Sequence, residues 1–83
     1  MKGRVHSMNL RRGMVAIATE GYGFTIIELL GGDELEVGDL MEWSPDTGLG
    51  RQRYHNLTKN TVLDVFAQNH WVPLQQLRQQ LLF

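Results

Sequence analysis

The stretch Gly13-Met14-Val15-Ala16-Ile17-Ala18-Thr19 decides the fold class of this chain. Larger and smaller side chains alternate along residues 14–19, which is typical of a β-strand with one face in a core. A glycine precedes the strand and Glu20-Gly21 follows it, so turns are expected at both ends. The stretch therefore predicts a half-buried strand between two turns.

Comparable segments lie on both sides of this strand. Further strands are expected at residues 4–8, 22–30, 40–43, 51–58 and 62–67. Short strands at a spacing of roughly ten residues indicate a mainly β domain, a small antiparallel barrel. We expect one domain over residues 1–83, with a barrel in 1–58, an extra strand and connection in 59–71, and a helix in 72–83. An SH3-like barrel is the alternative topology.

The last residues change from a strand period to a helical one. Pro73 suits the first turn of a helix, and leucines follow at i, i+3 and i+7 on one face. A helix this short is marginal alone, so it must pack on something. It would cap an open end of the barrel, or it would form a protein or homodimer contact. That interaction surface would consist of Leu74, Leu77, Leu81, Leu82 and Phe83.

The two tryptophans are expected to have different structural roles. Trp43 ends an apolar strand and is expected in the core. Trp71 lies between the last strand and the helix, where we expect it to anchor the helix to the barrel.

Composition restricts the class of protein. The 83 residues include no cysteine, which excludes a disulfide framework and a zinc ribbon. The apolar runs are too short for a transmembrane helix or a signal-peptide core, so no membrane association and a cytoplasmic location are expected. His6, His55 and His70 lack metal-ligand spacing, and the carboxylates form no catalytic pattern. We therefore expect no metal, no cofactor and no enzymatic activity.

The net charge of −1 conceals an uneven distribution. Residues 1–12 carry a net +4, residues 13–50 a net −8 and residues 51–83 a net +3. The two basic ends can act together only if the fold gathers them on one side.

Four segments resemble one known family. Gly3–Asn9, Gly13–Ile17, Val37–Trp43 and Gln52–Thr58 resemble strands of the cold-shock and S1-like group of OB-fold domains, over residues 2–58. The resemblance implies a five-stranded antiparallel OB-like barrel, to which this chain adds a strand and a short C-terminal α-helix. It also implies nucleic-acid binding through the second and third strands and the adjoining loops.

The chain differs from the family at the positions where family members stack bases on aromatic side chains. Ser7 stands in place of a stacking tryptophan, and Met14 and Ala16 replace two phenylalanines. Tyr22, Phe24 and Ile26 are the remaining third-strand candidates for the binding face. Each stacked base contributes about 1–3 kcal/mol, so binding here must depend more on charge.

Charge in the loops favours a non-catalytic module that binds single-stranded RNA or DNA. The first strand of an OB-like barrel neighbours the fourth and fifth strands, so we expect the fold to bring the two basic segments towards one side. Arginines in the first loop and after the fourth strand would hold phosphates, with a histidine and a methionine near the bases. The expected binding residues are Arg4, His6, Arg11, Arg12, Met14, Arg51 and Arg53. This binding fails if the helix covers the ligand face. The alternative function is a protein-protein interaction or homodimerisation module that uses the C-terminal leucine-rich helix.

Overall fold

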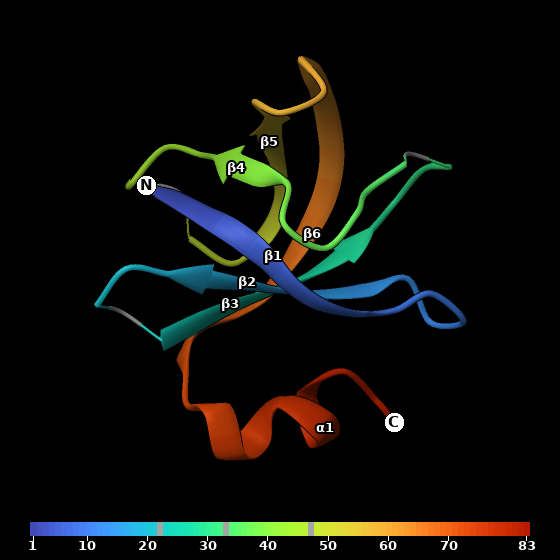
Figure 1. Ribbon diagram of the computed structural model, residues 1–83, viewed down its shortest axis with the longest axis vertical. Helices are drawn as coiled ribbons and strands as arrows, with labels where there is room; N and C mark the ends of the chain where they lie inside the picture. The colour runs from blue at the N-terminus through green and yellow to red at the C-terminus, as the bar shows by residue number, and fades with distance from the viewer. Residues whose placement is uncertain (22, 33, 47) are drawn as a thin grey trace.

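The computed structural model describes residues 1–21, 23–32, 34–46 and 48–83, so Tyr22 of the expected third strand lies outside the described residues. Within these ranges, six antiparallel strands close a barrel and a short helix follows (Figure 1). The prediction of a mainly β barrel with an extra strand and a C-terminal helix is confirmed. The elements are β1 (Lys2–Asn9), β2 (Met14–Thr19), β3 (Gly23–Leu29), β4 (Leu40–Glu42), β5 (Gly50–Asn56), β6 (Thr61–Val72), the 3-10 helix η1 (Leu74–Gln76) and α1 (Leu77–Gln80).

The barrel is built from two three-stranded meanders. The strand order is β1-β2-β3-β6-β5-β4, and it is closed by pairing of β1 with β4 and of β3 with β6. Strand β6 is 12 residues long, extends beyond the expected range 62–67, and forms part of the barrel wall. Strand β1 lies beside β4 as expected, whereas β5 lies between β4 and β6 and not beside β1.

The interior of the barrel holds the main hydrophobic core. Val15 and Ile17 of β2 point inward, as their alternation predicted. The prediction of a half-buried strand is wrong, however, because Met14 and Ala16 on the other face are buried too. Trp43 is buried as expected, and its ring stacks on Tyr54 with centroids 4.7 Å apart and an interplanar angle of 3°. Burial raises the pKa of Tyr54, whose hydroxyl has no hydrogen-bond partner among the described residues. The core cluster comprises Val5, Val15, Ile17, Ile27, Leu35, Met41, Trp43, Tyr54, Leu63, Val65 and Ala67.

A buried carboxylate joins the connection between β3 and β4 to the rest of the barrel. Asp39 Oδ2 accepts hydrogen bonds from the Glu36 backbone N at 3.0 Å, Asn56 Nδ2 at 2.8 Å and Lys59 Nζ at 2.8 Å. The Asp39 carbonyl accepts a further bond from the Val5 backbone N at 2.9 Å. One residue therefore links the loop to β1, to β5 and to the turn before β6.

The Asp39 network makes stability depend on pH. Burial by itself would raise the pKa of Asp39, but hydrogen bonds from Lys59 and Asn56 outweigh it and hold the pKa below the ordinary 3.8. Because the folded pKa is the lower one, this contribution is present above the ordinary pKa. It is lost as the pH falls through the folded pKa.

We predict that Asp39→Asn lowers the free energy of unfolding by about 1–3 kcal/mol near neutral pH, because the variant removes the charged acceptor of a buried network. Urea unfolding at neutral and acidic pH measures this, and the difference from wild type should shrink in acid. Asp64→Asn is the matched control, since its 3.6 Å pair with Arg53 is exposed and contributes at most about 1 kcal/mol. Equal stabilities of wild type and Asp39→Asn at neutral pH would contradict the assignment.

Candidate nucleic-acid interface

The outer face of β2 and β3 is the surface that the family resemblance assigns to nucleic acid. Met14 and Ala16 of β2 lie on it beside Ile26 of β3, and all three are buried in a second cluster with Leu77 and Leu81. Figure 1 shows α1 below β2 and β3. The helix therefore covers the expected binding face and does not cap an open end of the barrel.

Burial under the helix changes the assignment of three predicted residues. Met14 is only 4% exposed, so the expectation that it contacts bases is wrong. Leu77 and Leu81 are buried against their own chain and are unavailable to a partner, whereas Leu74, Leu82 and Phe83 are exposed. Phe24, the other described third-strand candidate, is partly buried against the same cluster.

Trp71 does not anchor the helix, contrary to expectation, because it is 72% exposed. The pairing of β6 with β3 shifts register between the Phe24 and Ile26 pairs, which marks a β-bulge. The bulge turns Trp71 outward, while Val72 packs under the helix. The helix end is held instead by Asn9, whose Nδ2 donates to the Leu81 carbonyl at 2.8 Å.

We predict that Leu81→Ala destabilises the protein by about 2–5 kcal/mol, because Leu81 is 1% exposed and fills the space between helix and sheet. Thermal or urea unfolding measures the effect. Leu74→Ala removes the same atoms from an exposed position and should change stability by less than about 0.5 kcal/mol. Comparable losses in the two variants would show that the helix does not pack as described.

The structure does not gather the arginines of the two basic segments. Arg11 and Arg12 lie in the turn between β1 and β2, whereas Arg51 and Arg53 lie on β5. Strands β3 and β6 separate β2 from β5 on one side, and β1 and β4 separate them on the other. Arg53 also pairs with Asp64. The expectation of one basic surface made by both segments is therefore wrong.

The predicted residues of β1 make contacts within the chain. Arg4 Nη1 donates to the Gly38 carbonyl at 2.9 Å. His6 Nδ1 lies 3.1 Å from Ser7 Oγ, and its ring meets Phe24 edge-on with centroids 5.0 Å apart. These side chains are exposed but belong to the wall of the barrel and not to the turn that carries Arg11 and Arg12.

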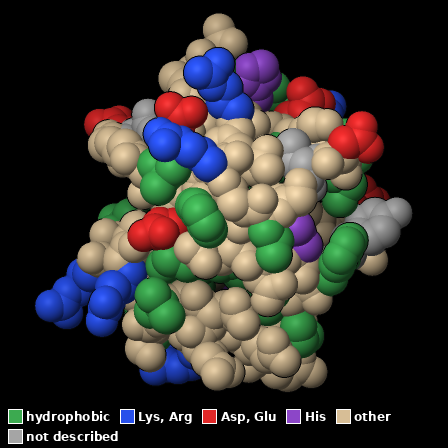
Figure 2. Space-filling view, turned by 180° about the vertical axis from the view of Figure 1, so that it is seen from behind, with side chains coloured by type: hydrophobic (Ala, Val, Ile, Leu, Met, Phe, Trp, Pro, Cys, Tyr) green, Lys and Arg blue, Asp and Glu red, His purple; other side chains and the backbone are tan. Residues whose placement is uncertain are grey.

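The two arginines of that turn face a groove at the end of the chain. Arg11 and Arg12 line a hollow of about 620 Å³ together with Asn9, Leu82 and Phe83. No ion pair engages either arginine within the described ranges. Figure 2 shows Lys and Arg side chains projecting at the lower left, where this turn lies in the rear view. We call this hollow the Arg11–Phe83 groove.

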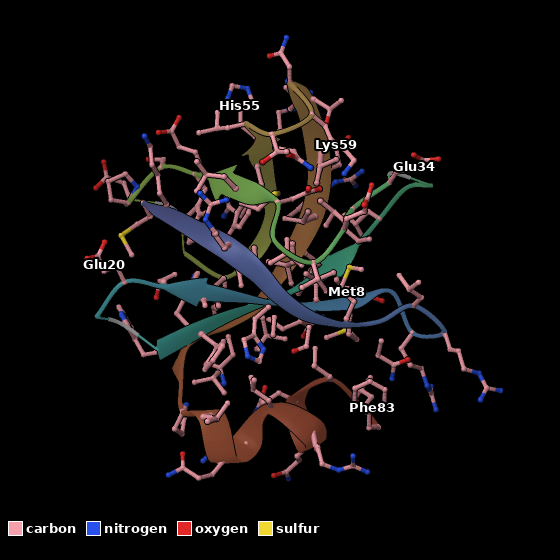
Figure 3. The ribbon with its side chains drawn as sticks, in the orientation of Figure 1. Met8, Glu20, Glu34, His55, Lys59 and Phe83 are labelled. Carbon is pink, nitrogen blue, oxygen red and sulfur yellow. The ribbon has the colours of Figure 1, made fainter. Side chains whose placement is uncertain are left out.

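The end of the helix positions the aromatic wall of the groove. The Leu82 N–H donates to the Gln79 carbonyl and the Phe83 N–H to the Arg78 carbonyl, each at 3.1 Å, which is the Schellman pattern of helix ends. The Phe83 ring lies 5.9 Å from Arg78 Cζ and remains 64% exposed. Figure 3 shows Phe83 below the barrel, far from His55 and Lys59. A third arginine therefore lies beside the groove.

Leu82 occupies a conformation that favours glycine. Its φ of 64° places it in the left-handed region, which costs a leucine about 1–2 kcal/mol. We predict that Leu82→Gly leaves stability unchanged or raises it by up to about 1 kcal/mol, as measured by urea unfolding. Leu74→Gly, at a position outside the left-handed region, should lower stability instead. A clear loss in Leu82→Gly would show that the leucine side chain contributes to packing.

No family model, curated protein or solved structure matches this chain. The resemblance to cold-shock domains therefore stays a prediction, and the site rests on its geometry. The described residues include no helix long and apolar enough to cross a membrane. They also bring no three histidine or acidic side chains close enough together to hold a metal ion.

Sequence reasoning missed the combination of Arg78 and Phe83 with the first turn. It assigned Phe83 to a protein-interaction surface and gave Arg78 no binding role. The five-residue spacing of Arg78 and Phe83 across a helix end is the signal in the sequence. Their proximity to Arg11 depends on the packing of the helix, which the spacing alone does not indicate.

Proposed function

We propose that this protein is a non-catalytic module that binds single-stranded nucleic acid, RNA or DNA, in the Arg11–Phe83 groove. The observation that supports this is the pairing of two exposed arginines, without acidic partners among the described residues, with an exposed aromatic ring. The proposal retains Arg11 and Arg12 from the sequence and replaces the other expected contacts.

The groove combines the two interactions that bind single strands without sequence preference. Guanidinium groups hold phosphate oxygens through paired hydrogen bonds, which Arg11 and Arg12 can provide. A base can stack on the exposed ring of Phe83, a contact worth about 1–3 kcal/mol. Arg78 lies 5.9 Å from the same ring and adds positive charge beside it.

The number of cations limits affinity and sets its salt dependence. Three arginines that neutralise three phosphates would make the logarithm of the binding constant fall with the logarithm of salt with a slope of about −2. The groove offers few donors or acceptors aimed at base edges, so we expect little sequence preference. Weak, salt-sensitive and sequence-tolerant binding is the expected behaviour.

We predict that Arg11→Ala/Arg12→Ala weakens binding of a labelled mixed-sequence oligonucleotide about tenfold or more at low salt, because two phosphate contacts are lost. Fluorescence anisotropy with RNA and with DNA over a salt series measures both affinity and slope. Phe83→Ala should cost a similar factor through lost stacking, with less change in the slope.

Arg51→Ala is the matched control, since this exposed arginine lies on β5, away from the groove. It should change affinity by less than about twofold, because it neutralises no phosphate bound in the groove. The proposal is overturned if neither oligonucleotide binds at low salt. It is also overturned if the double arginine variant binds as tightly as wild type.

A protein-interaction or homodimerisation module is the second candidate function. The exposure of Leu74, Leu82 and Phe83 favours it, although two of the five expected contact residues are buried in the chain itself. Sedimentation distinguishes the two functions. A dimer that dissociates in Phe83→Ala, and that Arg11→Ala/Arg12→Ala leaves intact, would support the second candidate.

A further inference from the structure

A second hollow lies at the opposite end of β2 from the Arg11–Phe83 groove. It has a volume of about 250 Å³ and sits at the mouth of the barrel, where β2 ends and β3 begins. Figure 1 places this end of β2 on the side of the N-terminus and the turn carrying Arg11 on the other side. Its described lining residues are Met1, Thr19, Thr25, Trp43, Pro45, His70 and Trp71. We call it the mouth pocket.

Both tryptophans of the chain line the mouth pocket. Trp43 is held from below by its stack on Tyr54. It is also held at the rim by Met1, whose amino nitrogen donates to the Trp43 carbonyl at 2.8 Å. The Met1 carbonyl accepts a bond from the Trp43 N–H at 3.0 Å. This wall of the pocket is therefore rigid.

Trp71 forms the opposite wall and is held there against a conformational cost. Its φ of 55° is rare for a bulky residue, and such strain costs about 1–3 kcal/mol. Gly23 makes the close approach possible, since a Cβ at that position would lie 2.9 Å from the Val72 carbonyl oxygen. The bulge and the glycine together present a large aromatic surface to solvent at the pocket rim. Strain of this kind clusters at binding sites.

The hydrogen bonds in the pocket determine which of its polar groups can still accept a bond from a ligand. His70 Nε2 lies 3.4 Å from the Gly48 carbonyl, which can only accept, so in the neutral ring Nε2 carries the proton. Nδ1 then accepts a bond from the Thr25 hydroxyl at 2.9 Å. The Thr19 hydroxyl donates to the Gly23 carbonyl at 2.8 Å. Both hydroxyl protons are therefore engaged, and both hydroxyl oxygens keep lone pairs that can accept.

The lining has no side chain that would pair with a charged ligand. The residues that line the mouth pocket in the described ranges include no Lys, Arg, Asp or Glu, and the Met1 amino group already donates to the Trp43 carbonyl. A cation in the pocket would lose hydration without a compensating partner, and an anion would have only the Met1 amino group to contact. Aromatic walls with few polar groups are typical of small-molecule sites, which occur often at the mouths of barrels.

From these observations we propose that the mouth pocket binds a small, uncharged, planar aromatic molecule that carries an N–H or O–H donor. The ring lies against Trp71 and the part of Trp43 that lines the pocket, and the donor bonds the hydroxyl oxygen of Thr25 or Thr19. This site shares no residue with the Arg11–Phe83 groove, so the proposal can be tested independently of the proposed nucleic-acid function.

The test uses indole as the probe and benzofuran as its comparator, since benzofuran has the same shape but no donor. Each is titrated into ¹⁵N-labelled protein while the two tryptophan Nε1–H signals are followed by NMR. Indole should shift both signals along saturating curves with a roughly millimolar Kd, the usual range for so small a ligand. Benzofuran should bind about fivefold more weakly, the equivalent of one neutral hydrogen bond.

Variants assign the two interactions separately. Trp71→Ala should weaken indole binding about tenfold or more, because it removes the exposed wall. Thr25→Val should reduce the preference for indole over benzofuran, because it removes a hydroxyl acceptor at nearly constant shape. Leu74→Ala is the control for loss of an exposed apolar side chain outside the pocket and should bind indole as wild type does.

Three results would overturn the proposal. The first is the absence of saturating shifts with indole. The second is equal affinity for indole and benzofuran in the wild-type protein. The third is a set of shifts at Trp71 that depend on protein concentration and not on ligand, which would show that a second copy of the chain occupies the pocket. A dispersed ¹⁵N spectrum and cooperative thermal unfolding of Trp71→Ala show that the variant is folded, and neither readout depends on the proposed nucleic-acid function.

Discussion

Burial of strand β2 on both faces is the constraint on which the rest of the structure depends. Strands of antiparallel sheets commonly have one wet face, but Met14, Val15, Ala16 and Ile17 are all buried. Val15 and Ile17 fill the barrel, while Met14 and Ala16 contact the C-terminal helix. An 83-residue chain buries a limited fraction of its surface, so this second apolar cluster extends an otherwise thin core.

The same burial explains the position of the Arg11–Phe83 groove. The helix must cross β2 and β3 to bury Leu77 and Leu81, so its end meets the turn that follows β1. The Schellman turn at that end then holds Phe83 beside Arg11. The helix thereby covers the outer face of β2 and β3, and the Arg11–Phe83 groove lies at the edge of that face.

At the opposite end of the barrel, the exposure of Trp71 depends on the path of β6 toward the helix. Strand β6 must deliver Val72 to the outer cluster, although its earlier residues Leu63, Val65 and Ala67 point into the barrel. Val72 lies five residues after Ala67, so the two-residue period by itself places it on the outer face, whereas the register shifts opposite β3 redirect the residues between them. The accompanying left-handed backbone at Trp71 turns its ring to the solvent at the mouth of the barrel. The exposure of Trp71 is thus a result of the irregular end of β6, while the packing of Val72 under the helix follows the regular strand period.

The sequence by itself determined the elements whose signals are local. Alternation located β2, glycines and turn residues separated the strands, and the leucine spacing after Pro73 identified a helix and its apolar face. Burial of Trp43 also followed from its place at the end of an apolar strand. Tertiary structure alone decided which strands are neighbours, which face the helix covers, and that Trp71 is exposed. These depend on contacts between residues far apart in the chain and on bulges that break the two-residue period, so no local pattern contains them.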